Sequence, residues 1–251
     1  MKCKIFLVVR TNSERLPKKA LLKIRRKPMI QILIDRIKNE NILSDIIVCT
    51  TNKKSDNELV NIVKKNKIKV FRGNEKDIIK RLHDAAKKFQ ISNFVVVEGD
   101  DIFCDLDLIK ETCQIINRRN VDFVRWEKVP FGSSPVGINS KKLTYLVNQK
   151  LVKNTETGWI KFILDSNLFR TKILVPKNKK LYRTEIRLSV DYREDLTLAK
   201  QLLKILPDNF RLIDIINTFK KFPELSKINE SVKLKYIENF EKKMIRSNYT
   251  K

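Results

Sequence analysis

The chain has 251 residues, of which 42% are hydrophobic, which is enough to bury the core of an α/β domain. We therefore expect a single domain over residues 1–251. No segment approaches the roughly 18 consecutive apolar residues that a membrane span needs. The N-terminal apolar run lacks the cleavage site of an export signal, so we expect a cytoplasmic protein. The cysteines lack CxxC spacing and His83 is the only histidine, which argues against a structural zinc site.

The composition is strongly basic. Lys and Arg number 54 against 29 Asp and Glu, which gives a formal net charge of +25. Such an excess is typical of proteins with polyanionic partners, such as nucleic acid, an anionic membrane or phosphorylated substrates. The lysines are nevertheless spread through every segment, and the chain has no RGG tract, zinc finger or RNP motif. We therefore favour a solvated lysine-rich surface over a nucleic-acid groove.

Short β-branched runs alternate with segments of helical periodicity through the first half of the chain. This order of elements predicts a mostly parallel sheet covered by helices, that is, a Rossmann-like three-layer α/β fold. The predicted strands cover residues 4–9, 45–50, 69–73, 94–101 and 122–126, and the predicted helices cover residues 28–39, 54–65, 75–90 and 106–119.

Residues 130–180 interrupt this alternation, and we expect them to form an inserted cap or a dimerisation arm. The segment begins with the loop sequence PFGSSPVG and continues with helices over 140–149 and 157–166 and a strand over 169–175. An apolar stripe in it would serve a homodimer interface or an internal core equally well; it consists of Leu143, Leu146, Val147 and Leu151. The chain is then expected to return to the sheet at 185–191 and to end in helices over 192–206, 211–221 and 229–246.

The first predicted strand is followed by the basic loop RTNSERLPKK, residues 10–19. In a doubly wound sheet, ligands bind beyond the carboxyl ends of the strands. Cationic side chains, a hydroxyl and backbone amides in such a loop can surround a triphosphate and stabilise charge on the departing pyrophosphate. The residues that would do so are Arg10, Ser13, Arg15, Lys18 and Lys19. A merely solvated basic turn is the alternative, and the position directly after the first strand argues against it.

Two later strands are predicted to end in carboxylates, in Glu98-Gly99-Asp100-Asp101 and in Ser189-Val190-Asp191. Carboxylates from neighbouring strand ends can converge on Mg²⁺, which is typically bound by one or two carboxylates together with substrate phosphates. We select Asp100 and Asp191 as this pair. Either residue alone could be a turn or helix N-cap aspartate, and the nearby basic loop favours the metal site.

Five motifs together resemble the SpsF-type cytidylyltransferases of surface-polysaccharide pathways, which are relatives of CMP-Kdo synthetase and acylneuraminate cytidylyltransferase. They are RTNSERLPKK at 10–19, TTN at 50–52, VFRGNEKDIIKRLHDAAKKF at 70–89, EGDDIFCD at 98–105 and RLSVDYREDL at 187–196. The resemblance covers nearly the whole chain. It implies a nucleotide-diphospho-sugar transferase fold and a Mg²⁺-dependent enzyme that transfers CMP from CTP to a sugar or sugar acid of the ulosonic or nonulosonic type, with release of pyrophosphate.

The resemblance also implies roles for individual residues. Arg10, Arg15 and Lys19 would be catalytic, Ser13 would bind the triphosphate, and Asp100 and Asp191 would hold Mg²⁺. Base and ribose would be approached by Thr50, Thr51, Arg72 and Arg81, although Arg72 could equally cap a helix and Arg81 could lie on a helix surface. The resemblance further implies a homodimer. The family's usual histidine-containing stretch reads KNTETGWI at 153–160 here, which leaves the acceptor sugar open.

Two alternatives remain open from the sequence. The first is a nucleotidylyltransferase that uses another nucleoside triphosphate or a non-sugar acceptor, and the absence of a glycine-rich GGxSxRxG-type loop favours CTP over this alternative. The second is a basic nucleic-acid-binding protein on the same fold, which would bind DNA or RNA in a salt-sensitive manner without turning over CTP.

Overall fold

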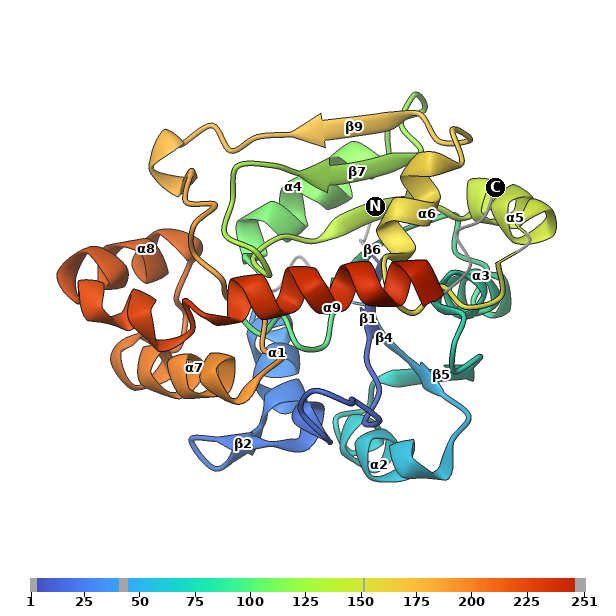
Figure 1. Ribbon diagram of the computed structural model, residues 1–251. Helices are drawn as coiled ribbons and strands as arrows, with labels where there is room; N and C mark the ends of the chain where they lie inside the picture. Colours follow the sequence, from blue (N-terminus) through green and yellow to red (C-terminus); the bar gives the residue numbers. More distant parts are fainter. Residues whose placement is uncertain (1–3, 41–44, 151, 247–251) are drawn as a thin grey trace.

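The computed structural model describes residues 4–40, 45–150 and 152–246. Within these ranges a sheet of seven strands has the order β5-β4-β1-β6-β8-β7-β9 (Figure 1). Only β8 runs antiparallel to the rest. The bounds are β1 (Lys4–Val8), β4 (Asp45–Thr51), β5 (Lys69–Gly73), β6 (Asn93–Glu98), β7 (Phe123–Trp126), β8 (Val136–Asn139) and β9 (Thr171–Leu174), with β2 (Lys23–Ile24) and β3 (Lys27–Pro28) forming a separate short ribbon.

Side-chain alternation along the strands creates two apolar faces. In β1, Ile5 and Leu7 contribute to one core cluster, whereas Phe6 and Val8 contribute to the other. One face is covered by α1 (Met29–Lys38), α2 (Asn57–Lys65), α4 (Leu106–Ile116), α7 (Arg193–Ile205) and α8 (Leu212–Lys221), and the opposite face by α3 (Ile78–Lys88), α5 (Ser140–Gln149) and α6 (Trp159–Asp165). The predicted three-layer α/β fold with a mostly parallel sheet is confirmed.

Aspartate caps define where two of these helices begin. The Asp77 carboxylate accepts a hydrogen bond from the Lys80 amide at 3.0 Å at the start of α3. Asp105 accepts from the amides of Asp107 and Leu108 at the start of α4, both at 3.0 Å. Its other carboxylate oxygen accepts from the Leu212 amide at 2.7 Å. One buried aspartate therefore caps α4 and also holds the start of α8 against it.

Residues 130–180 are more closely built into the sheet than an inserted arm would be. The end of the predicted loop PFGSSPVG enters β8, which lies between β6 and β7, and the predicted strand at 169–175 is the edge strand β9. In the predicted apolar stripe, Leu143 and Leu146 are buried in the core cluster that includes α3, so they serve the internal core. Leu151 lies outside the described residues. The homodimer remains a prediction.

The prediction of a strand at 185–191 is wrong. This segment makes only an isolated bridge between Phe131 and Arg187. Its backbone bonds instead to loops at the carboxyl end of the sheet, with the Leu188 amide donating to the Phe131 carbonyl at 2.7 Å and the Val190 amide donating to the Asp100 carbonyl at 3.1 Å. The segment thereby brings Asp191 to the end of β6 without joining the sheet.

The last helix, α9 (Val232–Arg246), runs away from α8 toward α6 (Figure 1). Gly158, the residue before α6, lies close to this helix: an added Cβ would lie 2.7 Å from the Met244 sulfur, so the methionine would have to move, and the φ of 73° at this position also favours glycine. Among the described residues, no helix is both long enough and apolar enough to span a membrane.

Candidate active site

The basic loop of residues 10–19 is hydrogen-bonded to Asp56, a buried aspartate in the connection that follows β4. Both the amide and the hydroxyl of Thr11 donate to Asp56 Oδ1, at 2.8 and 2.6 Å. The Thr11 carbonyl in turn accepts from the amides of Ser13 and Lys18, each at 3.0 Å. Lys18 adopts φ of 53°, in the left-handed region that glycine adopts most readily. The loop is thereby folded back on itself at the carboxyl end of β1.

The second oxygen of Asp56 is held by the two threonines that end β4. The hydroxyls of Thr50 and Thr51 donate to Asp56 Oδ2 at 2.7 and 2.5 Å. Burial by itself would raise the pKa of Asp56, but the hydrogen bonds from Thr11, Thr51 and Thr50 hold that pKa below its ordinary value. A permanent carboxylate therefore organises this corner of the site.

The four residues predicted to approach base and ribose divide into two groups. Thr50 and Thr51 are engaged with Asp56, and Arg72 donates to the Thr51 and Lys53 carbonyls at 2.9 and 2.6 Å. Thr50, Thr51 and Arg72 therefore hold neighbouring loops together through hydrogen bonds. None of the three lines a narrow cavity that lies beside the basic loop. Arg81 does line that cavity, and its buried Nε has no hydrogen-bond partner within the described part of the chain.

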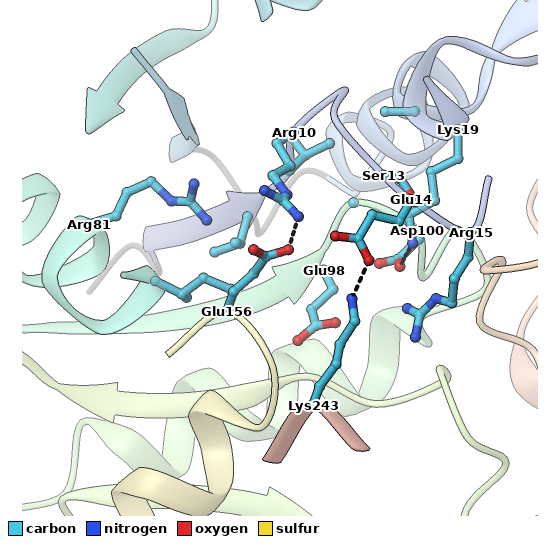
Figure 2. Close-up of a pocket in the computed structure, with 15 residues that line it drawn as sticks. Arg10, Ser13, Glu14, Arg15, Lys19, Arg81, Glu98, Asp100, Glu156 and Lys243 are labelled. Atoms are coloured by element: carbon cyan, nitrogen blue, oxygen red, sulfur yellow. Dashed lines mark hydrogen bonds and ion pairs between the residues drawn. The ribbon is translucent and has the colours of Figure 1, made fainter. Parts of the chain in front are cut away.

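A narrow cavity of about 150 Å³ lies beyond the carboxyl ends of β1 and β6. It brings together the three predicted catalytic cations, Arg10, Arg15 and Lys19, with Ser13 and Asp100 (Figure 2). It is also lined by three residues that the sequence did not single out as site residues, Glu14, Glu156 and Lys243. Glu156 lies in the stretch KNTETGWI, which replaces the usual family motif, and Lys243 lies on α9, where no motif marks it; they reach the cavity from the loop before α6 and from the last helix.

The two predicted metal-binding carboxylates converge on one lysine. The Lys19 ammonium forms ion pairs with Asp100 and, at 2.8 Å, with Asp191 Oδ1. Arg15 also contacts Asp191 Oδ1, at 2.5 Å. Burial alone would raise the pKa of Asp191, but Lys19, Arg15 and Arg187 hold that pKa far below its ordinary value. Asp191 is therefore a carboxylate at any physiological pH.

Asp191 is positioned by charged residues four places before and after it. Arg187 Nη2 donates to Asp191 Oδ2 at 2.7 Å, and Arg187 Nε donates to Asp195 at 3.1 Å. The Asp195 carboxylate also accepts from the amides of Asp191 and Tyr192, at 3.0 and 3.1 Å. This network was not predicted from the sequence, because residues 185–191 were assigned to a strand. The charged residues at 187, 191 and 195, spaced four apart, are the sequence feature that could have indicated it.

The donor set at this point fits Mg²⁺ shared with a substrate. Two further carboxyl groups, those of the half-buried Glu98 and the buried Asp101, lie beside Asp100. Desolvation first and the charge of Asp100 second raise the pKa of Glu98 to about 7 and that of Asp101 well above its ordinary value. Asp101 Oδ1 is buried and has no hydrogen-bond partner among the described residues. Across the described residues, no group of three or more His, Cys, Asp or Glu side chains is arranged to hold a metal ion by itself. Such a set suits an ion that completes its coordination with phosphate oxygens and water.

A second, larger cavity of about 740 Å³ adjoins the first and shares residues with it, among them Arg15, Glu98, Asp100 and Lys243. Its walls are rich in aromatic residues, namely Trp126, Phe131, Trp159, Tyr236 and Phe240. The indole of Trp159 donates to Glu98 Oε1 at 2.7 Å. The predicted metal-binding pair, Asp100 and Asp191, thus lies where a small polar cavity meets a larger, partly apolar one.

A mostly parallel sheet whose carboxyl edge holds a basic loop and paired carboxylates presents cationic and acidic groups where α/β folds of this kind bind nucleotides. The cytidylyltransferase family model matches residues 5–250, and the chain belongs to this family. The protein is therefore a nucleotidyltransferase that uses CTP.

The chain is also similar to individual proteins. An uncharacterized protein of Methanocaldococcus jannaschii is 32% identical over 237 residues, which cover 90% of this chain and 93% of that protein. The spore coat polysaccharide biosynthesis protein SpsF of Bacillus subtilis is 22% identical over 79% of this chain and 85% of its own length. The structure of a cytidylyltransferase from Leptospira borgpetersenii superposes with a TM-score of 0.81 at 24% identity, covering 90% of this chain and 96% of that one, and this shows the shared fold.

Proposed function

We propose that the protein transfers CMP from CTP to a hydroxyl group of a sugar acid, of the ulosonic or nonulosonic type, and releases pyrophosphate. The observation that supports this most directly is the junction of the two cavities. The triphosphate would occupy the narrow cavity beside residues 10–19, and the acceptor would occupy the larger one. The reacting phosphorus would then lie at the junction, beside Asp100 and Lys19.

In this reaction the acceptor oxygen forms a bond to the α-phosphorus, and the bond from that phosphorus to the oxygen bridging the α- and β-phosphates breaks. The hydroxyl proton leaves to solvent. The cations Arg10, Arg15 and Lys19 would stabilise the negative charge on the α-phosphate and on the departing pyrophosphate. Ser13 would donate a hydrogen bond to the triphosphate.

Asp100 and Asp191 would hold Mg²⁺. When bound, Mg²⁺ polarises phosphate oxygens and lowers the pKa of a hydroxyl near it. In the structure the Lys19 ammonium forms ion pairs with both carboxylates and helps to hold the pKa of Asp191 far below its ordinary value. The lysine thereby preserves a cation-binding pair until the nucleotide arrives.

The lining of the larger cavity suits an acidic sugar. Glu98, Asp100 and Glu156 line both cavities. Arg125 and Lys161 line the larger cavity and not the narrow one, and they form surface ion pairs with Glu127 and Asp165 that an acceptor carboxylate could replace. An acceptor that carries a carboxylate could present its hydroxyl to the metal pair and its carboxylate to these cations. The choice of a sugar acid also draws on the resemblance to CMP-Kdo synthetase, and the name of the Bacillus subtilis relative suggests a product used in polysaccharide synthesis.

We further propose that the enzyme acts in the cytoplasm, where CTP is available, and that it is a homodimer. A monomeric mass by light scattering at micromolar concentration would refute the homodimer.

The decisive experiment measures pyrophosphate release with each of the four ribonucleoside triphosphates and Mg²⁺, against a panel of ulosonic acids, nonulosonic acids and neutral polysaccharide sugars. We expect release with CTP and an acid. Release with neutral sugars alone would overturn the acidic acceptor. If no acceptor supports release and CTP does not raise the melting temperature, the proposed reaction is wrong, and salt-sensitive binding of DNA or RNA would then be tested.

A further inference from the structure

The C-terminal helix α9 places one face against the active site. Tyr236, Phe240 and Lys243 are spaced i, i+4 and i+7, so their side chains leave the same face of the helix. All three line the larger cavity, and Lys243 also lines the narrow one. Helix α9 therefore forms part of the wall between the proposed nucleotide and acceptor cavities.

Contacts with the catalytic segments fix the position of this helix. The ring of Tyr236 packs against the guanidinium groups of Arg15 and Arg187, with centroid distances of 5.5 and 4.6 Å. Near the start of α9, Lys235 forms an ion pair of 3.0 Å with Glu194 of α7. The side chain of Lys243 consequently enters the site from a defined direction, as Figure 2 shows.

The partner of Lys243 is a residue of the basic loop itself. Its ammonium lies 2.9 Å from Glu14 Oε2, and the Glu14 side chain is 75% exposed. Hydrogen bonding and the charge of Lys243 lower the pKa of Glu14. Ion pairs this exposed contribute little to stability, so an anionic ligand can displace the glutamate at small cost.

The other cations of the narrow cavity have more enclosed partners. Lys19 is held between Asp100 and Asp191, and Arg10 is paired with Glu156, whose side chain is 26% exposed. Of the ion pairs found in the described lining of this cavity, the pair between Lys243 and Glu14 has the most exposed carboxylate. Among the cavity cations that are held in ion pairs within the described residues, Lys243 is thus the one whose transfer to an incoming triphosphate requires the least disruption.

We propose that Lys243 is a nucleotide-binding residue, whose ammonium leaves Glu14 and binds the β- and γ-phosphate oxygens of CTP. This inference rests on the proposed function, because it takes the narrow cavity as the triphosphate site. The ammonium belongs there because it contacts a loop residue flanked by Ser13 and Arg15, both of which line the same cavity. The C-terminal helix would then add one cation to those that the basic loop presents to the triphosphate.

The test is isothermal titration calorimetry of CTP, CMP and inorganic pyrophosphate with the wild-type protein and with Lys243→Met. We expect the substitution to weaken the binding of CTP and of pyrophosphate by about tenfold or more, which corresponds to the loss of one charge-assisted hydrogen bond. The affinity for CMP should be unchanged. Lys243→Arg should keep most of the affinity. The matched control is Lys242→Met, which removes the same charge from an exposed position on the same helix and should bind all three ligands like the wild type.

A second variant separates ligand binding from a structural role of the ion pair. Glu14→Gln breaks the same pair while leaving Lys243 available, so CTP should bind as tightly as in the wild type or more tightly. Equal loss in Glu14→Gln and Lys243→Met would mean that the pair itself matters, and the proposal would be wrong.

Three further results would overturn it. If Lys243→Met binds CTP as tightly as a wild-type protein that binds CTP, Lys243 does not contact the triphosphate, and the proposed function is unaffected. If the substitution weakens the binding of CMP and of CTP equally, Lys243 does not contact the β- and γ-phosphates. If CTP affinity is unchanged but the KM for the acceptor rises, Lys243 contacts the acceptor instead. A wild-type protein that binds no CTP instead refutes the proposed function together with this inference.

Discussion

Replacing Lys19 with methionine tests whether Asp100 and Asp191 form a cation site. The Lys19 side chain is 13% exposed and its ammonium contacts both carboxylates, one of them Asp191 Oδ1 at 2.8 Å. Burial would lower the pKa of Lys19, but the two aspartates hold it above its ordinary value. Methionine has a similar shape and no charge. The variant therefore leaves two neighbouring carboxylates without the cation that lies between them.

In Mg²⁺-free buffer we expect Lys19→Met to be much less stable than the wild type. Removing one partner of a buried ion pair costs about 3–5 kcal/mol of the free energy of unfolding. For a chain of this length the melting temperature falls by about 2–4 °C per kcal/mol, which gives a drop of roughly 6–20 °C. Mg²⁺ should then bind the vacated pair and, at ten times its Kd, restore about 1.4 kcal/mol. In the wild type Lys19 competes for the same carboxylates, so Mg²⁺ alone should stabilise the protein less.

The assay is thermal unfolding with and without MgCl₂, and Lys150→Met is the matched control. Lys150 forms an ion pair with Asp77 in which the side chains are 11% and 6% exposed. Its loss should destabilise the fold comparably without creating a metal site. An equal response of the two variants to Mg²⁺, or a Lys19→Met variant as stable as the wild type, would refute the reasoning.

Three other predictions concern single carboxyl groups. Asp100→Asn should lower kcat at saturating CTP on the order of 10²–10³-fold, as when one group that stabilises transition-state charge is lost; full activity would remove Asp100 from the metal site. The pKa of Glu98 is raised from 4.5 to about 7, mainly by burial, so the native state retains a proton that the unfolded chain has lost. The free energy of unfolding should therefore fall between about pH 4.5 and pH 7, by at most about 1.4 kcal/mol per unit. Glu98→Gln should flatten this slope in urea denaturation, and an unchanged slope would contradict the assignment. Glu156→Gln should free Arg10 and tighten CTP binding severalfold by calorimetry, whereas weaker binding would make Glu156 a ligand-binding residue.

Several features of the fold follow from local sequence. The β-branched runs and amphipathic segments up to residue 126 predict the five sheet strands and the four α-helices that are observed there, though not the short ribbon of β2 and β3. Burial of alternate or of every third to fourth residue is encoded locally. The basic loop was also predictable, since it follows directly after β1 and loops at that edge of a parallel sheet face the ligand. Asp100 ends up beside it for the same reason.

Short segments whose partners are distant in sequence were not predictable in the same way. The pattern at 185–191 alternates like a strand, but its amides find the carbonyls of Phe131 and Asp100 in loops instead of a neighbouring strand. Val136–Asn139 became the antiparallel strand β8 because β6 and β7 supplied edges on both sides of it. A strand of four residues has too little local signal to choose between such partners.

The sequence by itself determined the class of fold, the basic loop and the two aspartates that face it. Only the tertiary structure decided what those groups contact. It placed Lys19 between Asp100 and Asp191, which follow it by 81 and 172 residues, and it brought Glu156 and Lys243 to the loop from a connection and from the last helix. The reason is physical: a local pattern specifies which face of an element is buried, whereas the pairing of charges depends on how separate elements pack over the sheet.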